Sequence, residues 1–200
     1  MKKILAHFKK VDPILYSWTV KVGKLETIIK DKQENYFYRL CREIVCQQLS
    51  DRAGMAIFTR FEKLFPKGLK SKYLIKTSHE KLRATGMSHA KARYVRNLAE
   101  AIDKKVLDFN IFDSLSDEEI IKRLTSVKGI GPWTAEMFLM FTLGRENVFS
   151  HGDLGLRKAL KKIYKFKKEP SKNKVGSIVQ RWSPYKTYAS RILWASLELQ

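Results

Sequence analysis

Residues 124–141, LTSVKGIGPWTAEMFLMF, place a Gly-Ile-Gly-Pro turn between two apolar helical patterns. Pro132 favours the start of a helix, because proline at the first helical position loses no hydrogen bond. Gly129 and Gly131 permit a tight reversal of the chain and the close approach of another backbone. The stretch therefore predicts two helices joined by a compact hairpin.

The charge of the chain suggests a partner for this hairpin. Forty Lys and Arg residues against twenty Asp and Glu give the 200-residue chain a net charge of +20. This balance is typical of nucleic-acid-binding proteins, with a basic but inert surface or an anionic-membrane surface as the alternatives. Free N–H groups at the start of the second helix form an anion site, so we favour a DNA phosphate there. A plain helix–turn–helix corner remains the alternative.

The rest of the chain shows helical periodicity and few strand signals, which predicts an all-α protein. Apolar stripes are expected on one helix at Phe37, Leu40, Cys41, Ile44 and Val45, and on the next at Ala53, Ile57, Phe61, Leu64 and Phe65. Asp12-Pro13 has the pattern of an N-cap followed by proline at the first helical position. Capping boxes are expected at residues 77–80 and 116–119, and the two cysteines are too few for an iron–sulfur cluster or a four-ligand zinc site. No apolar run is long enough for a signal peptide or a membrane span. We therefore expect an intracellular protein, in the cytoplasm or nucleoid, or in the nucleus if the host is eukaryotic.

Two positions in the last third of the chain are candidates for a site. Asp153 follows Gly152 and precedes a helical pattern, where a helix N-cap is the local explanation. Trp194 lies off the stripe of the final helix, so it either packs against a neighbour or lines a cleft. That stripe is Ala189, Ile192, Leu193, Ser196 and Leu197.

Five stretches, taken together and in this order, resemble one family. They are EIVCQQLSDRA (43–53), LRATGMSHAKARYVRNLA (82–99), VKGIGPWTA (127–135), FSHGDLGLRKAL (149–160) and RWSPYKTYASRILW (181–194). The chain resembles the helix-hairpin-helix (HhH-GPD) superfamily of base-excision DNA glycosylases, and within it the 3-methyladenine DNA glycosylase II branch. The resemblance spans about residues 12–194.

The resemblance implies a single glycosylase unit over residues 1–200, built of two helical lobes with a cleft for DNA and the base between them. We expect one lobe at about 36–143 and the other at about 1–35 plus 144–200. Bacterial members often carry an additional N-terminal α/β domain, and we expect none here. Bifunctional relatives have a Schiff-base lysine where this chain has Trp133, which predicts a hydrolase without strand-cleaving lyase activity.

The same resemblance assigns roles to residues. Asp153 is the expected catalytic carboxylate, and Trp133, Trp194 and Met137 are expected to line the base pocket. A wedge that fills the gap left by a flipped base is expected in Gln47, Gln48 and Leu49, with Gln48 the best match. The expected hairpin contacts to DNA are Lys128, Gly129, Ile130, Gly131 and Thr134. The backbone carbonyls of Thr125, Val127 and Ile130 match the positions that hold a monovalent cation, Na+ or K+, in the family.

The expected activity is hydrolysis of the N-glycosidic bond of alkylated purines, of the 3-methyladenine and 7-methylguanine type, in duplex DNA. The expected partner is double-stranded DNA with alkylated bases. We expect no required cofactor, no membrane partner and a monomer. A glycosylase for oxidised or deaminated purines and a non-catalytic DNA-binding module are the alternatives.

Overall fold

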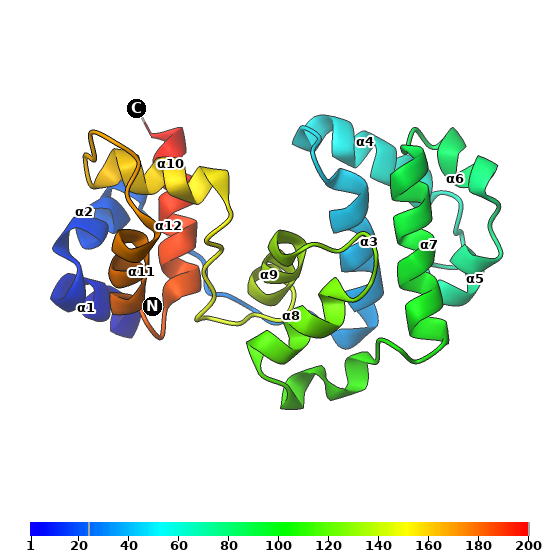
Figure 1. Ribbon diagram of the computed structural model, residues 1–200, viewed down its shortest axis with the longest axis horizontal. Coiled ribbons are helices and arrows are strands. Elements are labelled where there is room, and N and C mark those ends of the chain that lie inside the picture. Colours follow the sequence, from blue (N-terminus) through cyan, green and yellow to red (C-terminus); the bar gives the residue numbers. More distant parts are fainter. Residues whose placement is uncertain (24, 200) are drawn as a thin grey trace. The chain divides into compact units, whose positions relative to one another are not determined.

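The computed structural model describes residues 1–23 and 25–199. Helices joined by turns and irregular segments make up this part of the chain, and no strand occurs in it, which confirms the predicted all-α class (Figure 1). The chain divides into two compact units. We call residues 31–138 the central unit, and residues 1–30 together with 139–200 the terminal unit.

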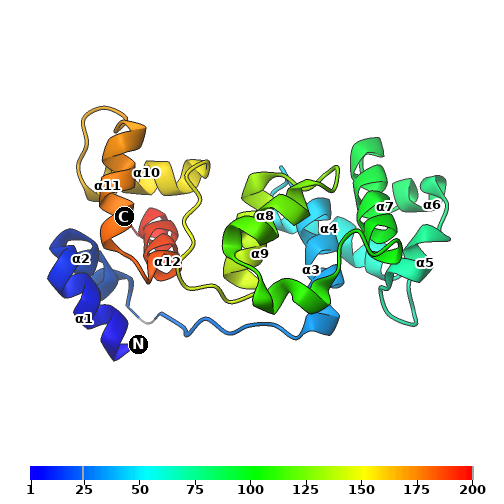
Figure 2. The same ribbon diagram turned by 60° about the horizontal axis from the view of Figure 1, so that its bottom comes forward.

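The central unit is a helical bundle in which α5 and α6 lie beside α7 (Figure 1, Figure 2). Its elements are η1 (Gln33–Asn35), α3 (Tyr36–Cys46), α4 (Asp51–Glu62), α5 (Ser71–Ile75), α6 (His79–Ala84), α7 (His89–Asp103), η2 (Phe109–Ser114), α8 (Asp117–Thr125) and the first turns of α9 (Pro132–Phe141).

Serine N-caps start several of these helices. Ser116 and Glu119 form the predicted capping box at the start of α8, with each side chain accepting a hydrogen bond from the other residue's backbone N–H. The prediction of a box at residues 77–80 was wrong in register. Ser78, not Thr77, caps α6 by accepting from the N–H of Lys81, while the Thr77 hydroxyl donates to the Tyr73 carbonyl.

The core of the central unit follows one predicted stripe and departs from another. On α3 the expected residues are buried: Phe37, Leu40, Cys41, Ile44 and Val45. On the stripe expected for α4 and the turn after it, Phe61 and Phe65 are buried as predicted, whereas Ala53, Ile57 and Leu64 are not. Gly54 and Phe58 are buried in their place. Gly54 sets this register: a Cβ there would lie 3.0 Å from the Cys46 sulfur, so α4 packs its glycine against α3.

The terminal unit brings both ends of the chain into one core. It contains α1 (Lys2–Val11), α2 (Pro13–Val22), α10 (Leu154–Ile163), α11 (Lys172–Arg181), α12 (Lys186–Glu198) and the end of α9. Helix α12 contacts both α10 and α2. Ala189, Ile192 and Leu193 are buried as expected, whereas Leu197, predicted on the same stripe, is 39% exposed because it lies in the last turn of the helix.

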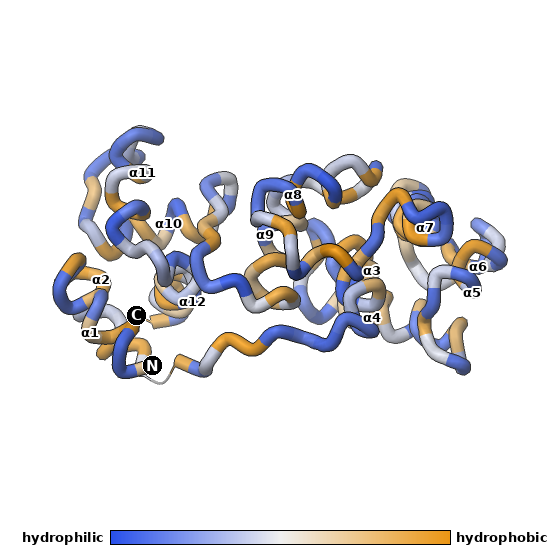
Figure 3. Tube along the Cα trace, turned by 90° about the horizontal axis from the view of Figure 1, so that it is seen from below, coloured by the Kyte–Doolittle hydropathy of each residue, from blue (hydrophilic) through white to orange (hydrophobic). Residues whose placement is uncertain are grey.

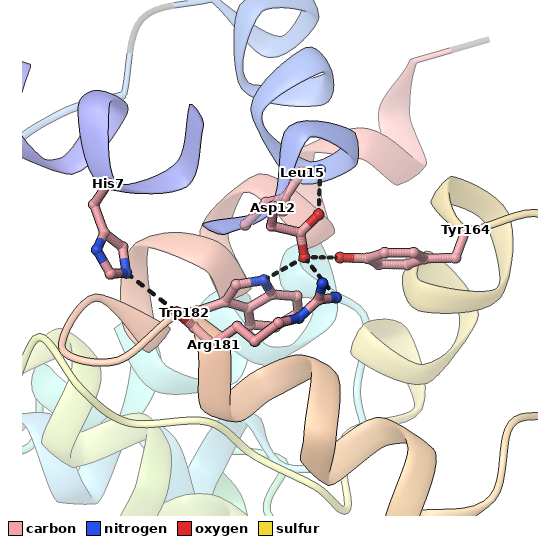
Figure 4. Close-up of polar contacts among 6 residues, drawn as sticks. All are labelled: His7, Asp12, Leu15, Tyr164, Arg181 and Trp182. Atoms are coloured by element: carbon pink, nitrogen blue, oxygen red, sulfur yellow. Dashed lines mark hydrogen bonds and ion pairs between the residues drawn. The ribbon is translucent and has the colours of Figure 1, made fainter. Parts of the chain in front are cut away.

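One buried carboxylate joins three segments of this unit (Figure 4). Asp12 is 1% exposed and is the N-cap of α2, as predicted, accepting from the backbone N–H of Leu15 at 3.1 Å. Its second oxygen accepts from the Tyr164 hydroxyl, from Trp182 Nε1 at 2.9 Å and from the guanidinium of Arg181 at 3.1 Å. The carboxylate therefore connects α2 to the ends of α10 and α11.

Hydropathy alternates along the helices of the described chain and does not collect in one long apolar segment (Figure 3). No helix within residues 1–23 and 25–199 combines the length and apolar character needed to cross a bilayer.

Candidate active site and DNA-binding elements

The predicted hairpin lies between the end of α8 at Thr125 and the start of α9 at Pro132. Gly129 has φ +115°, a conformation that residues with side chains rarely adopt. A Cβ at this position would lie 2.3 Å from Cγ of Tyr94. Gly129 is therefore required by the fold of the central unit itself, both by its backbone angle and by the packing of α7.

Gly131 is different from Gly129. Its φ is not positive, and a Cβ there would meet nothing within 4 Å. It lines a surface hollow of about 670 Å³, together with Gln47, Gln48, Tyr94, Gly129, Ile130, Trp133 and Thr134. The described chain does not require glycine at this position, which leaves room for something outside the protein to approach the start of α9.

The hairpin side chains differ in accessibility. Lys128 is exposed, whereas Ile130 and Thr134 are 4% and 3% exposed. The backbone carbonyl of Lys128 accepts a hydrogen bond from Asn97 Nδ2 at 3.0 Å. Tyr94 and Asn97 were not among the predicted site residues, and their i, i+3 spacing on one face of α7 was the available signal.

The predicted wedge forms a turn between α3 and α4, which we call the wedge turn (residues 47–49). Gln47 is the C-cap of α3, and its side-chain amide donates to the Gly129 carbonyl and to the Thr134 hydroxyl, both at 3.1 Å. Gln48 has φ +56°, a left-handed conformation for a residue with a long side chain. Leu49 is 39% exposed. The structure thus ties Gln47 to the hairpin and leaves Leu49 accessible.

A second hollow, of about 360 Å³, lies beside the wedge turn. Its lining includes Arg42, Glu43, Cys46, Gln47, Gln48, Leu49, Asp51, Met55 and Trp133. Burial raises the pKa of the Glu43 carboxyl, against the opposing effect of Arg42 and Arg39. Trp133 is 41% exposed in the first turn of α9, whereas Met137, one turn further along the helix, is 6% exposed.

The terminal unit places the predicted catalytic residue against one of the predicted indoles. Asp153 is 8% exposed and is the N-cap of α10, where its Oδ1 accepts from the Leu156 N–H at 2.7 Å. The same oxygen accepts from Trp194 Nε1 at 3.1 Å. Asp153 therefore caps α10 and also contacts Trp194, which lies 41 positions further along the sequence.

Phe141 and Gly155 lie next to the pair formed by Asp153 and Trp194. The ring of Phe141 lies 5.8 Å from that of Trp194, measured between centroids, and Phe141 is 51% exposed. A Cβ on Gly155 would lie 3.1 Å from Oδ1 of Asp153 and 3.2 Å from the Trp194 ring. Neither residue was among the predicted site residues, because their contacts with Trp194 join segments that are distant in the sequence.

The backbone carbonyls of the hairpin are ligands of the type that binds a monovalent cation such as Na+ or K+. Oxygen from backbone carbonyls is the ligand type by which proteins replace the hydration shell of such ions. The Val127 carbonyl accepts one hydrogen bond, from the Ile130 N–H at 3.0 Å, which leaves it a second lone pair. Across residues 1–23 and 25–199, no group of three or more His, Cys, Asp or Glu side chains could hold a metal ion.

Comparison with known proteins identifies the protein superfamily to which the chain belongs. Residues 41–184 match the HhH-GPD superfamily, described as base excision DNA repair proteins. The chain belongs to this superfamily.

Within this superfamily, the chain is similar to proteins named 3-methyladenine DNA glycosylases. The chain is 34% identical over 172 residues to DNA-3-methyladenine glycosylase 1 of Schizosaccharomyces pombe, which covers 84% of this chain and 75% of that protein. It is 35% identical over 129 residues to the putative DNA-3-methyladenine glycosylase YfjP of Bacillus subtilis, covering 64% of this chain and 45% of that protein's length.

Its fold is also similar to a solved structure, S. pombe 3-methyladenine DNA glycosylase (Mag1) in complex with abasic DNA. The TM-score is 0.88 at 30% sequence identity, and the match covers 98% of this chain and 97% of that chain. The family predicted from the sequence is thereby confirmed.

Proposed function

We propose that this protein is a monofunctional DNA glycosylase that hydrolyses the N-glycosidic bond of alkylated purines in duplex DNA, as a step of base excision repair. The observation that carries the proposal is the hydrogen bond between Trp194 and Asp153, which holds an indole beside a carboxylate at the start of α10. The relatives named 3-methyladenine DNA glycosylases support the choice of alkylated purines as the substrate.

Asp153 is proposed to stabilise the transition state. Alkylation at N3 or N7 makes the purine cationic, so the base leaves as a neutral molecule with the electrons of the C1′–N bond. Positive charge develops on the sugar as that bond breaks, and a nearby carboxylate stabilises it. Water then forms the new bond to C1′, and its proton passes to the carboxylate or to solvent.

Aromatic surfaces are proposed to select the cationic base. An indole face attracts a cation by about 2 kcal/mol or more once water is excluded. Trp133 and Trp194 are the proposed indoles, with Met137 as the third predicted residue of the base pocket. The Trp194 N–H already donates to Asp153, which fixes the edge of that ring. The exposed ring of Phe141 extends the aromatic surface beside Trp194.

The central unit is proposed to hold the DNA. A damaged base inside a duplex must be flipped out before its glycosidic bond can be reached. The open space at Gly131 suits a phosphate approaching the start of α9, and the wedge turn would fill the vacated position. A monovalent cation on the carbonyls of Thr125, Val127 and Ile130 would add positive charge beside the phosphate. DNA as the substrate implies a location inside the cell.

No lyase step is proposed, because position 133 holds tryptophan and supplies no amine for a Schiff base. The reaction therefore ends with a free base and an abasic site in an intact strand.

The test is to incubate the protein with methylated duplex DNA and measure free bases by chromatography. Asp153→Asn keeps one oxygen that can accept from Leu156 and Trp194, so we expect the fold and duplex affinity to persist and the rate to fall at least about 100-fold. Asp103→Asn, an exposed substitution on α7, is the control. Full turnover by Asp153→Asn would remove the catalytic assignment. Duplexes with oxidised or deaminated purines, tested in parallel, would reveal a different substrate class.

A further inference from the structure

The wedge turn has a conformation that needs support. Its backbone leaves α3 at Gln47, which is extended at φ −46° and ψ 133°, and passes directly into the left-handed conformation at Gln48. Glycine would adopt this angle freely, whereas a residue with a side chain keeps it only when its surroundings enforce it. The last carbonyls of α3 also need hydrogen-bond donors from outside the helix.

Lys91 supplies those donors. Its ammonium group donates to the Val45 carbonyl at 2.8 Å and to the Gln47 carbonyl at 2.6 Å. Lys91 lies in the first turn of α7, so the contact is tertiary and joins two helices. A positive charge at a helix C-terminus is also favourable to the helix dipole. Burial lowers the pKa of the lysine, as expected for an ammonium group drawn into the protein.

The other side of the turn is attached to the hairpin. The Gln47 side chain reaches the Gly129 carbonyl and the Thr134 hydroxyl, while its own carbonyl accepts from Lys91. Helix α7 also contacts the hairpin through Tyr94, which packs on Gly129, and through Asn97, which donates to Lys128. One face of α7 therefore holds both the wedge turn and the hairpin.

This arrangement separates Lys91 from the many lysines that give the chain its charge. An exposed lysine contributes to DNA binding as a mobile point charge that contacts phosphate. Lys91 instead directs two of its three N–H donors at carbonyls within the protein. Its effect on DNA therefore has to pass through the backbone that it holds.

We propose that Lys91 is the positioning residue of the base-flipping step: it holds the wedge turn in its inserted conformation before DNA arrives. The proposal rests on the proposed function, because it assigns Lys91 to the flipping that precedes glycosidic hydrolysis. A wedge held in advance favours the flipped state most where the base must be unpaired. It matters little where the lesion has no pairing partner, since extrusion is then easy.

The experiment uses two duplexes that carry the same 7-methylguanine, one opposite cytosine and one opposite a stable abasic analogue. Single-turnover release of the base is measured for wild type and for Lys91→Met, which keeps an apolar stem and removes the donors. We expect a loss of about tenfold on the paired duplex, because small misplacements are costly in rate. The loss on the unpaired duplex should stay below about twofold, and Lys91→Arg should restore the paired rate.

Lys104→Met is the matched control, because it removes one exposed lysine from the C-cap of the same helix. It should leave the ratio of the two rates unchanged. Equal losses on both duplexes, or no loss on either, would overturn the proposal. If Lys91→Met does not fold, as judged by circular dichroism, Lys91→Gln takes its place, since its shorter side chain does not reach both carbonyls.

Fluorescence of 2-aminopurine beside the lesion separates this proposal from the proposed function. It reports unstacking in the same complexes without any bond cleavage. A wild type that unstacks the neighbour but releases no base would contradict the glycosylase activity alone. Unstacking that is equally strong in Lys91→Met would contradict the positioning role, whatever the enzyme does to the base.

Discussion

The two glycines of the hairpin should respond to alanine in opposite ways. In Gly129→Ala, the new Cβ would lie 2.3 Å from Cγ and 2.4 Å from Cβ of Tyr94. Overpacking of this kind costs about 1–3 kcal/mol. The positive φ adds about 1–2 kcal/mol for a residue that has a side chain. The expected loss is therefore about 2–5 kcal/mol, out of a total stability of about 5–15 kcal/mol.

Gly131→Ala should not destabilise the protein. Its added Cβ meets open space and its φ is not positive, so the main effect is on the unfolded chain. A stabilisation of about 0.4–1 kcal/mol is expected. If a DNA phosphate approaches this position, the same variant should bind all duplexes more weakly, whatever their sequence. Its salt slope should then fall by about one.

The assays are urea unfolding and duplex binding at several salt concentrations. The measurement includes the double variant Gly129→Ala with Tyr94→Ala. Truncating Tyr94 removes the ring but keeps the Cβ at 2.4 Å, so the pair should not regain the stability lost in Gly129→Ala. A free energy of unfolding for Gly129→Ala within about 0.5 kcal/mol of wild type would refute the packing argument. A Gly131→Ala protein with unchanged affinity would refute the phosphate assignment.

Two further predictions concern buried carboxyl groups. Asp12→Asn replaces an oxygen with an N–H₂ group among the donors of Leu15 and Trp182, and should cost about 2–4 kcal/mol in thermal or urea unfolding. Asp108→Asn, at the partly exposed N-cap of η2, should stay within about 0.5 kcal/mol of wild type. A similar cost at both sites would contradict the reasoning. Burial raises the pKa of Glu43, so the folded protein holds the proton of this carboxyl more tightly than the unfolded chain does. The stability that this protonation contributes is present at low pH and is lost as the pH rises through the folded pKa. Glu43→Gln should therefore unfold less readily than wild type near neutral pH and match it below about pH 4, and a gain at low pH alone would reverse that sign.

Local sequence patterns were sufficient for the features that depend on residues a few positions apart. The N-cap at Asp12, the capping box at Ser116 and the buried stripe of α3 follow from local hydrogen bonding and helical period. Asp153 at the start of α10 belongs to the same group. Predictions of this kind succeed because the interacting groups lie within one turn of helix, where spacing alone sets the geometry.

The register of α4 and the exposure of α9 were decided by contacts that no local pattern contains. Gly54 faces Cys46 of another helix, so Gly54 and Phe58 are buried where Ala53 and Ile57 were expected, although Phe61 is buried as predicted. Trp133 and Phe141 are exposed although the sequence of their helix is apolar on nearly all sides. Helical period describes one helix and contains nothing about which neighbours cover it.

Only the tertiary structure brought the candidate site together. The hydrogen bond from Trp194 to Asp153 spans 41 positions, and that from Lys91 to Gln47 spans 44. The tertiary structure also distinguished Gly129, which the packing of Tyr94 requires, from Gly131, which nothing in the described chain requires. The physical reason is that hydrogen bonds and steric exclusion act within a few ångströms of space, while sequence spacing predicts distance only inside a single helix or turn.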